Sequence, residues 1–129
     1  MEEQSGPGQT FIKIIETNTG KIAVVKSDAP MINDGQSAVD FGLRIVYEHD
    51  CRNIAINKSA ISGDFFKLST GVAGEITQKF VNYRIRLAII GDFSGYTSKP
   101  LHDFIYESNN GRHLYFAEDE NEAIDWLNN

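Results

Sequence analysis

Hydrophobic residues recur with two different periods along the chain, and the change from one period to the other separates the expected elements. Phe11, Ile12, Ile14 and Ile15 make a first, mostly apolar run and residues 22–25 make a second; residues 17–20 between the two runs are of turn-forming types. Two such runs joined by a short turn predict a β-hairpin, in which Gly20 can take a positive φ without steric cost. After Pro30 the apolar residues recur about every 3.6 positions, which predicts a helix capped by Asp34.

Three further strand patterns alternate with three further helical ones. Residues 54–56, 87–90 and 114–116 are short and wholly apolar, as strands covered on both faces of a parallel sheet should be. Helical spacing runs from about residue 70 to 82, and it returns after caps at Ser98 and Asp119. The predicted order is ββαβαβαβα. It corresponds to an α/β fold with a single mixed, mostly parallel sheet of about five strands, in which one hairpin strand runs antiparallel.

The size of the chain indicates a single folded unit. Its 129 residues and mass of 14.4 kDa fit one domain, which we expect to span residues 10–129. Residues 1–9 are polar and contain Gly6, Pro7 and Gly8, so we expect a disordered leader there.

Charge and composition narrow the classes of partner. Eighteen acidic against twelve basic residues give a net charge of −6, which argues against binding to nucleic acids or to anionic membranes. The single cysteine, Cys51, rules out an internal disulfide and suits a reducing compartment. The apolar runs are too short to span a bilayer, and no signal peptide is visible. We therefore expect a cytoplasmic protein without a nucleic-acid or membrane partner.

Residue patterns for catalysis or for a cofactor do not stand out. His49 and Cys51 are close in sequence, but no second cysteine or His-x-x-x-His spacing accompanies them, so no metal site is predicted. The serines of residues 91–98 lack the Gly-x-Ser-x-Gly turn that surrounds many nucleophiles. The glycines of residues 71–74 and 91–95 match neither a Walker loop nor a dinucleotide-binding fingerprint. We expect neither catalytic residues nor a cofactor.

Two loops are the natural place for binding. The carboxyl ends of parallel strands usually carry the ligand or partner site, and here those ends lead into residues 57–70 and 91–98. Ser69 and Thr70 precede the helix expected from Gly71, so either hydroxyl is suited to cap it. Tyr96 is an aromatic residue in a polar loop, a feature enriched in binding surfaces, although packing over its own loop is the simpler interpretation.

Residues 64–111 resemble a bacterial family called domain of unknown function 4180, to which no activity is assigned, and the likeness extends over nearly all of the expected domain. In architecture the chain is similar to the STAS domains (sulfate transporter and anti-sigma factor antagonist), which have the SpoIIAA-like fold. Residues 68–74, Leu-Ser-Thr-Gly-Val-Ala-Gly, occupy the position of the STAS motif Asp-Ser-Ser/Thr-Gly. Residues 87–91 and 122–127 look like the strand and the closing helix that follow that motif.

The STAS resemblance implies a regulatory serine. In anti-sigma factor antagonists a partner kinase phosphorylates the first serine of the motif, and the phosphate controls binding. Carried over to this sequence, that serine is Ser69. Two positions depart from the family pattern, since Leu68 replaces the motif's Asp and Asn57 replaces the Asp at the end of the preceding strand.

The sequence supports two functional hypotheses. The first is a non-catalytic regulatory or protein-interaction module, whose unidentified protein partner would contact Ser69, Thr70, Gly71, Asp92 and Tyr96. The second is a protein that binds a small apolar or lipid-like ligand in a pocket lined by Phe65, Phe66, Phe80 and Tyr96. An enclosed apolar cavity would favour the ligand, whereas an exposed surface over a packed interior would favour the partner.

Overall fold

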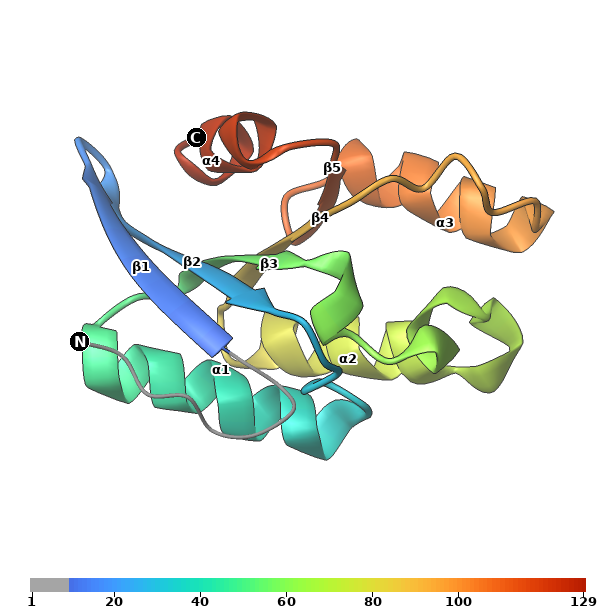
Figure 1. Cartoon of the computed structure of the whole chain (residues 1–129), viewed down its shortest axis with the longest axis horizontal. Coiled ribbons are helices and arrows are strands. Elements are labelled where there is room, and N and C mark those ends of the chain that lie inside the picture. The colour runs from blue at the N-terminus through green and yellow to red at the C-terminus, as the bar shows by residue number, and fades with distance from the viewer. Residues whose placement is uncertain (1–9) are drawn as a thin grey trace.

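The structure is a computed structural model that describes residues 10–129, and the leader expected at residues 1–9 lies outside the described residues. Within that range the chain forms one five-stranded mixed sheet and four α-helices (Figure 1). The elements follow the predicted order ββαβαβαβα. The strands lie side by side in the same order as in the sequence.

The antiparallel part of the sheet is the amino-terminal hairpin. Strands β1 (Thr10–Thr17) and β2 (Gly20–Ser27) pair along their whole length, and two residues connect them. Gly20 has a φ of 142°, a conformation that suits glycine at the end of this tight turn. β1 is an edge strand, whereas β2 continues into the rest of the sheet.

The remaining strands are parallel to β2. They are β3 (Asn53–Asn57), β4 (Arg86–Ile90) and β5 (Leu114–Ala117). β3 and β4 lie inside the sheet, which is where their apolar runs, residues 54–56 and 87–90, predicted them to be.

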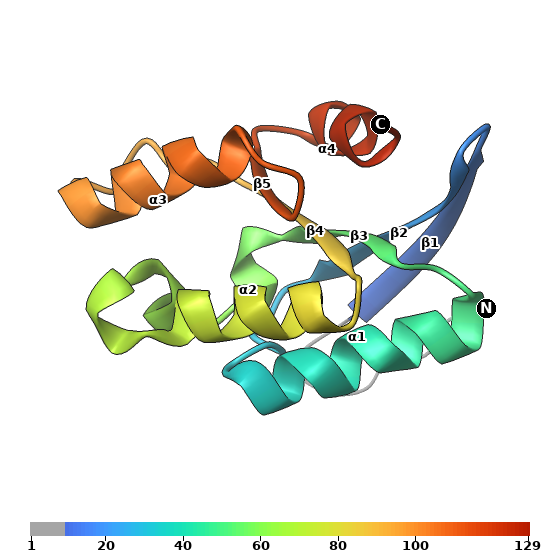
Figure 2. The ribbon, with the colours of Figure 1, turned by 180° about the vertical axis from the view of Figure 1, so that it is seen from behind.

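The helices cover the two faces of the sheet unequally. The three crossover helices are α1 (Gly35–His49), α2 (Val72–Asn82) and α3 (Lys99–Asn109). Each connection moves to the next strand in the same direction, so right-handed crossovers place all three on one face. Only the short α4 (Glu120–Leu127) packs on the opposite face, as the two views show (Figures 1 and 2).

The two faces have cores of different size. The larger core, under α1 to α3, contains large side chains such as Ile54, Ile56, Ile89 and Phe116. The smaller core, under α4, contains an alanine from each of three neighbouring strands, namely Ala55, Ala88 and Ala117. Small side chains let a helix lie close to a sheet, which explains how two turns of α4 can cover this area. None of the helices within residues 10–129 has the length and apolar character needed to cross a membrane.

Side-chain caps begin three of the helices, as the sequence predicted. The carboxylate of Asp34 accepts a hydrogen bond from the Ser37 N–H at 2.9 Å, and Asp119 does the same for Glu122. The Ser98 hydroxyl accepts the Leu101 N–H at 3.3 Å at the start of α3. α2 is different, because the residue that precedes it is Gly71 with a φ of 80°.

Candidate functional site

The carboxyl ends of β3 and β4 lead into the two loops that we expected to bind. The first loop folds into three short 3₁₀ helices, η1 (Lys58–Ala60), η2 (Gly63–Phe66) and η3 (Leu68–Thr70). The second loop, residues 91–98, connects β4 to α3. Both loops lie at the same edge of the sheet, because β3 and β4 are parallel neighbours.

Aromatic rings join the two loops to each other and to α3. The rings of Phe66 and Tyr96 stack with centroids 5.3 Å apart, and Phe93 meets Phe116 edge to face at 5.2 Å. We call the whole group the aromatic cluster; its members are Phe65, Phe66, Phe93, Tyr96, Phe104 and Phe116. Ring pairs of this kind contribute about 0.5–1.5 kcal/mol beyond their buried area. The aromatic cluster therefore holds the two loops in one arrangement.

Lys58 lies across the junction of the two loops. Its ammonium is 4.7 Å from the centroid of the Tyr96 ring and donates a hydrogen bond to the Asp92 carbonyl oxygen at 2.9 Å. The side chain can take this path only because residue 91 is glycine, since a Cβ there would lie 2.8 Å from the Lys58 Cβ. Lys58 therefore links the first turn after β3 to the loop after β4.

Asp92 shapes its own loop. One carboxylate oxygen accepts hydrogen bonds from both the hydroxyl and the N–H of Ser94, at 2.7 and 2.9 Å. These bonds lower the pKa of Asp92, first through the Ser94 hydroxyl, then through the Ser94 N–H, and the nearby Lys58 charge adds to the effect. An exposed carboxylate that is held ionised and already bonded is suited to a structural or binding role rather than to proton transfer.

The segment from Ser69 to Gly71 differs from the capping arrangement that we predicted. The Thr70 hydroxyl lies 2.7 Å from the Asp64 carbonyl oxygen and 2.8 Å from that of Lys67, and it accepts the Val72 N–H at 3.2 Å. The Ser69 hydroxyl caps nothing, and the N-cap position itself is Gly71. Ser69 is exposed, and its side chain makes no hydrogen bond within the described chain. The reason is the extra 3₁₀ turn, which places Gly71 instead of Ser69 at the residue that precedes α2.

The structure brings some of the predicted binding residues together and separates others. Asp92 and Tyr96 meet at Lys58. Ser69 and Thr70 lie on η3, which follows η2 and its ring contact with Tyr96, and Gly71 comes directly after η3. Among the four predicted pocket residues, Phe66 and Tyr96 are in contact, and Phe65 is fully buried within the aromatic cluster. Phe80 is buried elsewhere, against Gly42 and Ile85 between α1 and α2.

The clefts at this edge are open to solvent. One of about 470 Å³ lies at the ends of β3 and β4 and includes Lys58, Phe66 and Tyr96 in its lining. A neighbouring cleft of about 630 Å³ runs beside α3, and a smaller one of about 320 Å³ lies at the end of β2. The space between the loops and the sheet is occupied by the aromatic cluster, so these clefts are surface features over a packed interior.

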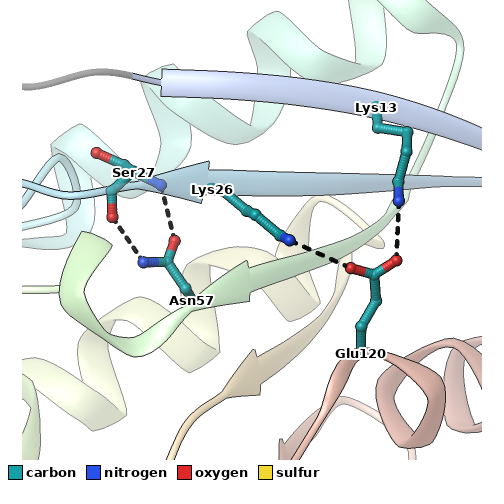
Figure 3. A network of polar contacts seen from close by, with 5 residues as sticks. All are labelled: Lys13, Lys26, Ser27, Asn57 and Glu120. Carbon is teal, nitrogen blue, oxygen red and sulfur yellow. Dashed lines mark hydrogen bonds and ion pairs between the residues drawn. The ribbon is translucent and has the colours of Figure 1, made fainter.

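One polar contact at this edge was missed by the sequence analysis. The Asn57 side chain accepts the Ser27 N–H at 2.8 Å and donates to the Ser27 carbonyl oxygen at 2.6 Å (Figure 3). The amide thus bonds both backbone groups of Ser27, where β2 and β3 separate. The only sequence signal for this role was an amide residue directly after the apolar run of residues 54–56.

A second polar group ties the hairpin to α4. Lys13 and Lys26 point at the carboxylate of Glu120, with N–O distances of 3.0 and 3.6 Å (Figure 3). The hydrogen bond from Lys13 lowers the pKa of Glu120, and the charges of both lysines add to the effect. The three charged side chains lie on the face of the sheet that α4 only partly covers.

The groups considered for metal binding do not assemble. Within residues 10–129 no cluster of three or more His, Cys, Asp or Glu side chains could hold a metal ion. Cys51 is buried, and its thiol donates to the carbonyl oxygens of Lys21 and Asn53. Burial raises the pKa of the Cys51 thiol.

Comparison with known proteins places the chain in a family. No curated protein matches the sequence. A family model described as "Domain of unknown function (DUF4180)" matches residues 17–127, from the last residue of β1 to the last residue of α4. That match covers the hairpin turn, all four helices and both loops at the carboxyl edge, so this chain belongs to the DUF4180 family.

Proposed function

We propose that this protein is a non-catalytic regulatory or interaction module that binds a protein partner through the loops at the carboxyl edge of its sheet. The surface in question, here called the edge surface, consists of Ser69, Thr70, Gly71, Asp92 and Tyr96. The observation that carries the proposal is the aromatic cluster, which fills the interior behind these loops and fixes their shape. A rigid exposed surface over a packed interior suits a protein partner better than an engulfed ligand.

The topology of the sheet also supports a binding module. Open α/β enzymes bind their ligands in a crevice where the strand order reverses. Here the strands follow chain order from β1 to β5, and α1 to α3 share one face, so the sheet has no such reversal. The usual geometric basis for a nucleotide crevice is therefore missing from the described fold.

The similarity to STAS domains supports a regulatory role for Ser69. From β3 onward the chain runs strand, loop, helix, strand, helix, short strand and closing helix, the order that the resemblance to STAS domains led us to expect. Ser69 is exposed and lies just before α2, where backbone N–H groups and the positive end of the helix dipole face outward. A phosphate there would add about −1.5 to −2 charges and could be held by these groups without refolding.

A second candidate is the binding of a small apolar or lipid-like molecule. The cleft of about 470 Å³ favours it, because Ile61, Phe66, Ile90 and Tyr96 give that cleft an apolar lining. Lys58 at the same cleft would suit an acidic headgroup. Titration with a fluorescent fatty acid tests this candidate, with Tyr96→Leu as the variant that alters the lining of the cleft. A ligand-binding protein should give a saturable signal, whereas a protein-interaction module should give none.

Site-specific photo-crosslinking in the native cell tests the main proposal. A crosslinking amino acid at Ser69 samples the edge surface, and the same residue at Tyr47 is the matched control. Tyr47 is 81% exposed and lies near the carboxyl end of α1. That helix leads back to the amino ends of the parallel strands, away from the edge surface. We expect a partner that crosslinks from position 69 and not from position 47.

The role of Ser69 as a switch is tested in the same system. With the crosslinker moved to Thr97 in the second loop, Ser69→Asp should change the yield of that partner, while Ser69→Ala should preserve it. Identical crosslinked proteins from positions 69 and 47 would contradict the interaction surface. Equal yields of the crosslinked partner from wild type and Ser69→Asp would be consistent with the interaction surface but would contradict a switch at Ser69.

A further inference from the structure

The outermost strands of the sheet, β1 and β5, differ in how far their outward backbone groups are already bonded. At the β5 edge, the Asn109 side chain accepts the Phe116 N–H at 2.8 Å and donates to the Phe116 carbonyl oxygen at 3.3 Å. Asn109 therefore occupies the backbone groups that another strand would need. Within residues 10–129 no side chain bonds the outward backbone groups of β1 in this way. β1 is also the longer edge strand, with eight residues against four.

The hairpin geometry shows which β1 residues present these groups. Thr17 and Gly20 flank a two-residue turn and form the last bonded pair of the hairpin. Bonding then alternates along an antiparallel ladder, so residues 11, 13, 15 and 17 bond to β2. The backbone groups of Thr10, Ile12, Ile14 and Glu16 point away from the sheet.

The side chains of β1 make this edge apolar. Phe11 is 43% exposed and Ile12 is 39% exposed, while Ile14 and Ile15 are half-buried. Long apolar edge strands pair with other strands unless charges, prolines or bulges prevent it. The one lysine of β1, Lys13, is paired with Glu120 at 3.0 Å, so its charge is largely compensated within the chain.

We propose that two copies of this protein associate through β1, which pairs antiparallel with β1 of the second copy and joins the two sheets into one. The two-fold axis passes beside Ile14, which lies opposite Ile14 of the second copy. In this register Ile12 faces Glu16 of the second copy, and Lys13 faces Ile15 of the second copy. The occupant of the edge is thus a second copy of this chain.

The register follows from the backbone and from charge. Only residues with outward groups can bond across the new pair, so even-numbered residues must face even-numbered ones. The alternative axis beside Lys13 pairs about the same length of strand but sets Lys13 directly against Lys13 of the second copy. Like charges directly opposite each other destabilise a strand pair, so the axis beside Ile14 is preferred. An isologous contact of this kind closes after two copies.

Sedimentation of the full chain over a range of concentrations tests the proposal. At physiological salt, which screens the net charge of −6, the wild type should move from 14.4 kDa toward twice that mass as its concentration rises. Ile12→Glu places a glutamate opposite Glu16 of the second copy. We expect it to weaken association about tenfold or more. The double variant Ile12→Glu/Glu16→Lys restores opposite charges across the pair and should recover association.

Tyr106→Glu is the matched control, because it adds the same charge at a side chain that is 72% exposed on α3, away from β1. It should associate like the wild type, and circular dichroism should show all variants folded. A wild type that stays monomeric up to about 1 mM, the weak end of specific association, overturns the proposal. Equal weakening by Tyr106→Glu, or a double variant that fails to recover, also overturns it.

Discussion

The guanidinium of Arg86, at the first residue of β4, lies 4.2 Å from the ring centroid of Trp126 in α4. The same group donates hydrogen bonds to the carbonyl oxygens of Trp126 at 3.3 Å and Leu127 at 3.2 Å. These are carbonyls at the carboxyl end of α4, which no further helical turn can satisfy and which attract a positive charge. Arg86 therefore attaches the last helix to the sheet.

Replacement of Arg86 by lysine should destabilise the protein by about 1–2 kcal/mol, because an ammonium cannot bond several carbonyls and stack on the indole at the same time. Chemical denaturation measures the loss. Arg112→Lys, at an exposed residue, keeps the same charge balance and should leave the denaturation midpoint unchanged. Equal midpoints for Arg86→Lys and wild type would show that the charge alone holds α4.

Two helical glycines should respond to alanine in opposite ways. At Gly42 in α1 an added Cβ would lie 2.9 Å from atoms of both Phe80 and Ile85, so Gly42→Ala should lower the free energy of unfolding. At Gly74 in α2 the space is open, and Gly74→Ala should raise it by about 0.5–1 kcal/mol through helix propensity. Denaturant titration measures the free energy of unfolding of both variants. An increase for Gly42→Ala would contradict the prediction.

Phe80→Ala should cost about 3–5 kcal/mol, as truncation of a large buried aromatic side chain does. Phe80 is only 2% exposed and fills the space beside Gly42. In this background Gly42→Ala should lose part of its own cost, because the Phe80 ring that its Cβ would meet is gone while the contact with Ile85 remains. A double-mutant cycle measures the coupling. Additive effects would mean that the helices adjust without contact between these two positions.

Thr70 should contribute more to stability than its neighbour Ser69. Thr70→Val removes a hydroxyl that bridges carbonyl oxygens of the η2–η3 turn and accepts the Val72 N–H, so it should cost about 1 kcal/mol. Ser69→Ala removes an exposed hydroxyl without a partner and should change the midpoint little. Thermal unfolding compares the two. A larger loss of stability from Ser69→Ala than from Thr70→Val would contradict the assignment of the stabilising hydroxyl to Thr70.

Stability should fall at alkaline pH through Tyr115. Its hydroxyl donates to the Glu122 carboxylate, and this bond, with burial and nearby negative charge, raises the pKa of Tyr115 to about 12. An unfolded tyrosine has a pKa of about 10. The neutral ring is thus favoured in the folded state, and its contribution is complete below pH of about 10 and is lost as the pH rises to about 12.

Tyr115→Phe should show a weaker loss of stability over this pH range than the wild type, as measured by denaturation at several pH values. Tyr47→Phe removes an exposed hydroxyl and serves as the control that keeps the wild-type profile. If Tyr115→Phe and wild type lose stability in parallel, other groups govern the alkaline limit.

The local pattern of residues was sufficient for the elements and their order. Caps at Asp34, Ser98 and Asp119 act on backbone groups three residues away, so a short stretch of sequence contains both partners. The wholly apolar runs of β3 and β4 likewise predicted strands buried on both faces, since any other position would expose them to water. The hairpin turn at Gly20 followed from the same kind of short-range information.

Contacts between distant residues were decided only by the tertiary structure. The sequence allowed a cap from either Ser69 or Thr70. The structure shows that the Thr70 hydroxyl bonds the Val72 N–H and also the Asp64 carbonyl of the preceding turn, while Gly71 takes the N-cap position. Phe80 and Tyr96 both fit an apolar pocket by composition, yet they lie in different parts of the core.

The same limit applies to the polar contacts of the sheet edges. Asn57 bonds the backbone of Ser27, and Asn109 bonds that of Phe116, while an asparagine in the sequence alone is equally typical of a turn. Periodicity records which side of an element faces the core, and the sequence therefore determined the elements. Which side chains meet across the core depends on how strands and helices stack after the chain has folded, and only the tertiary structure settles that.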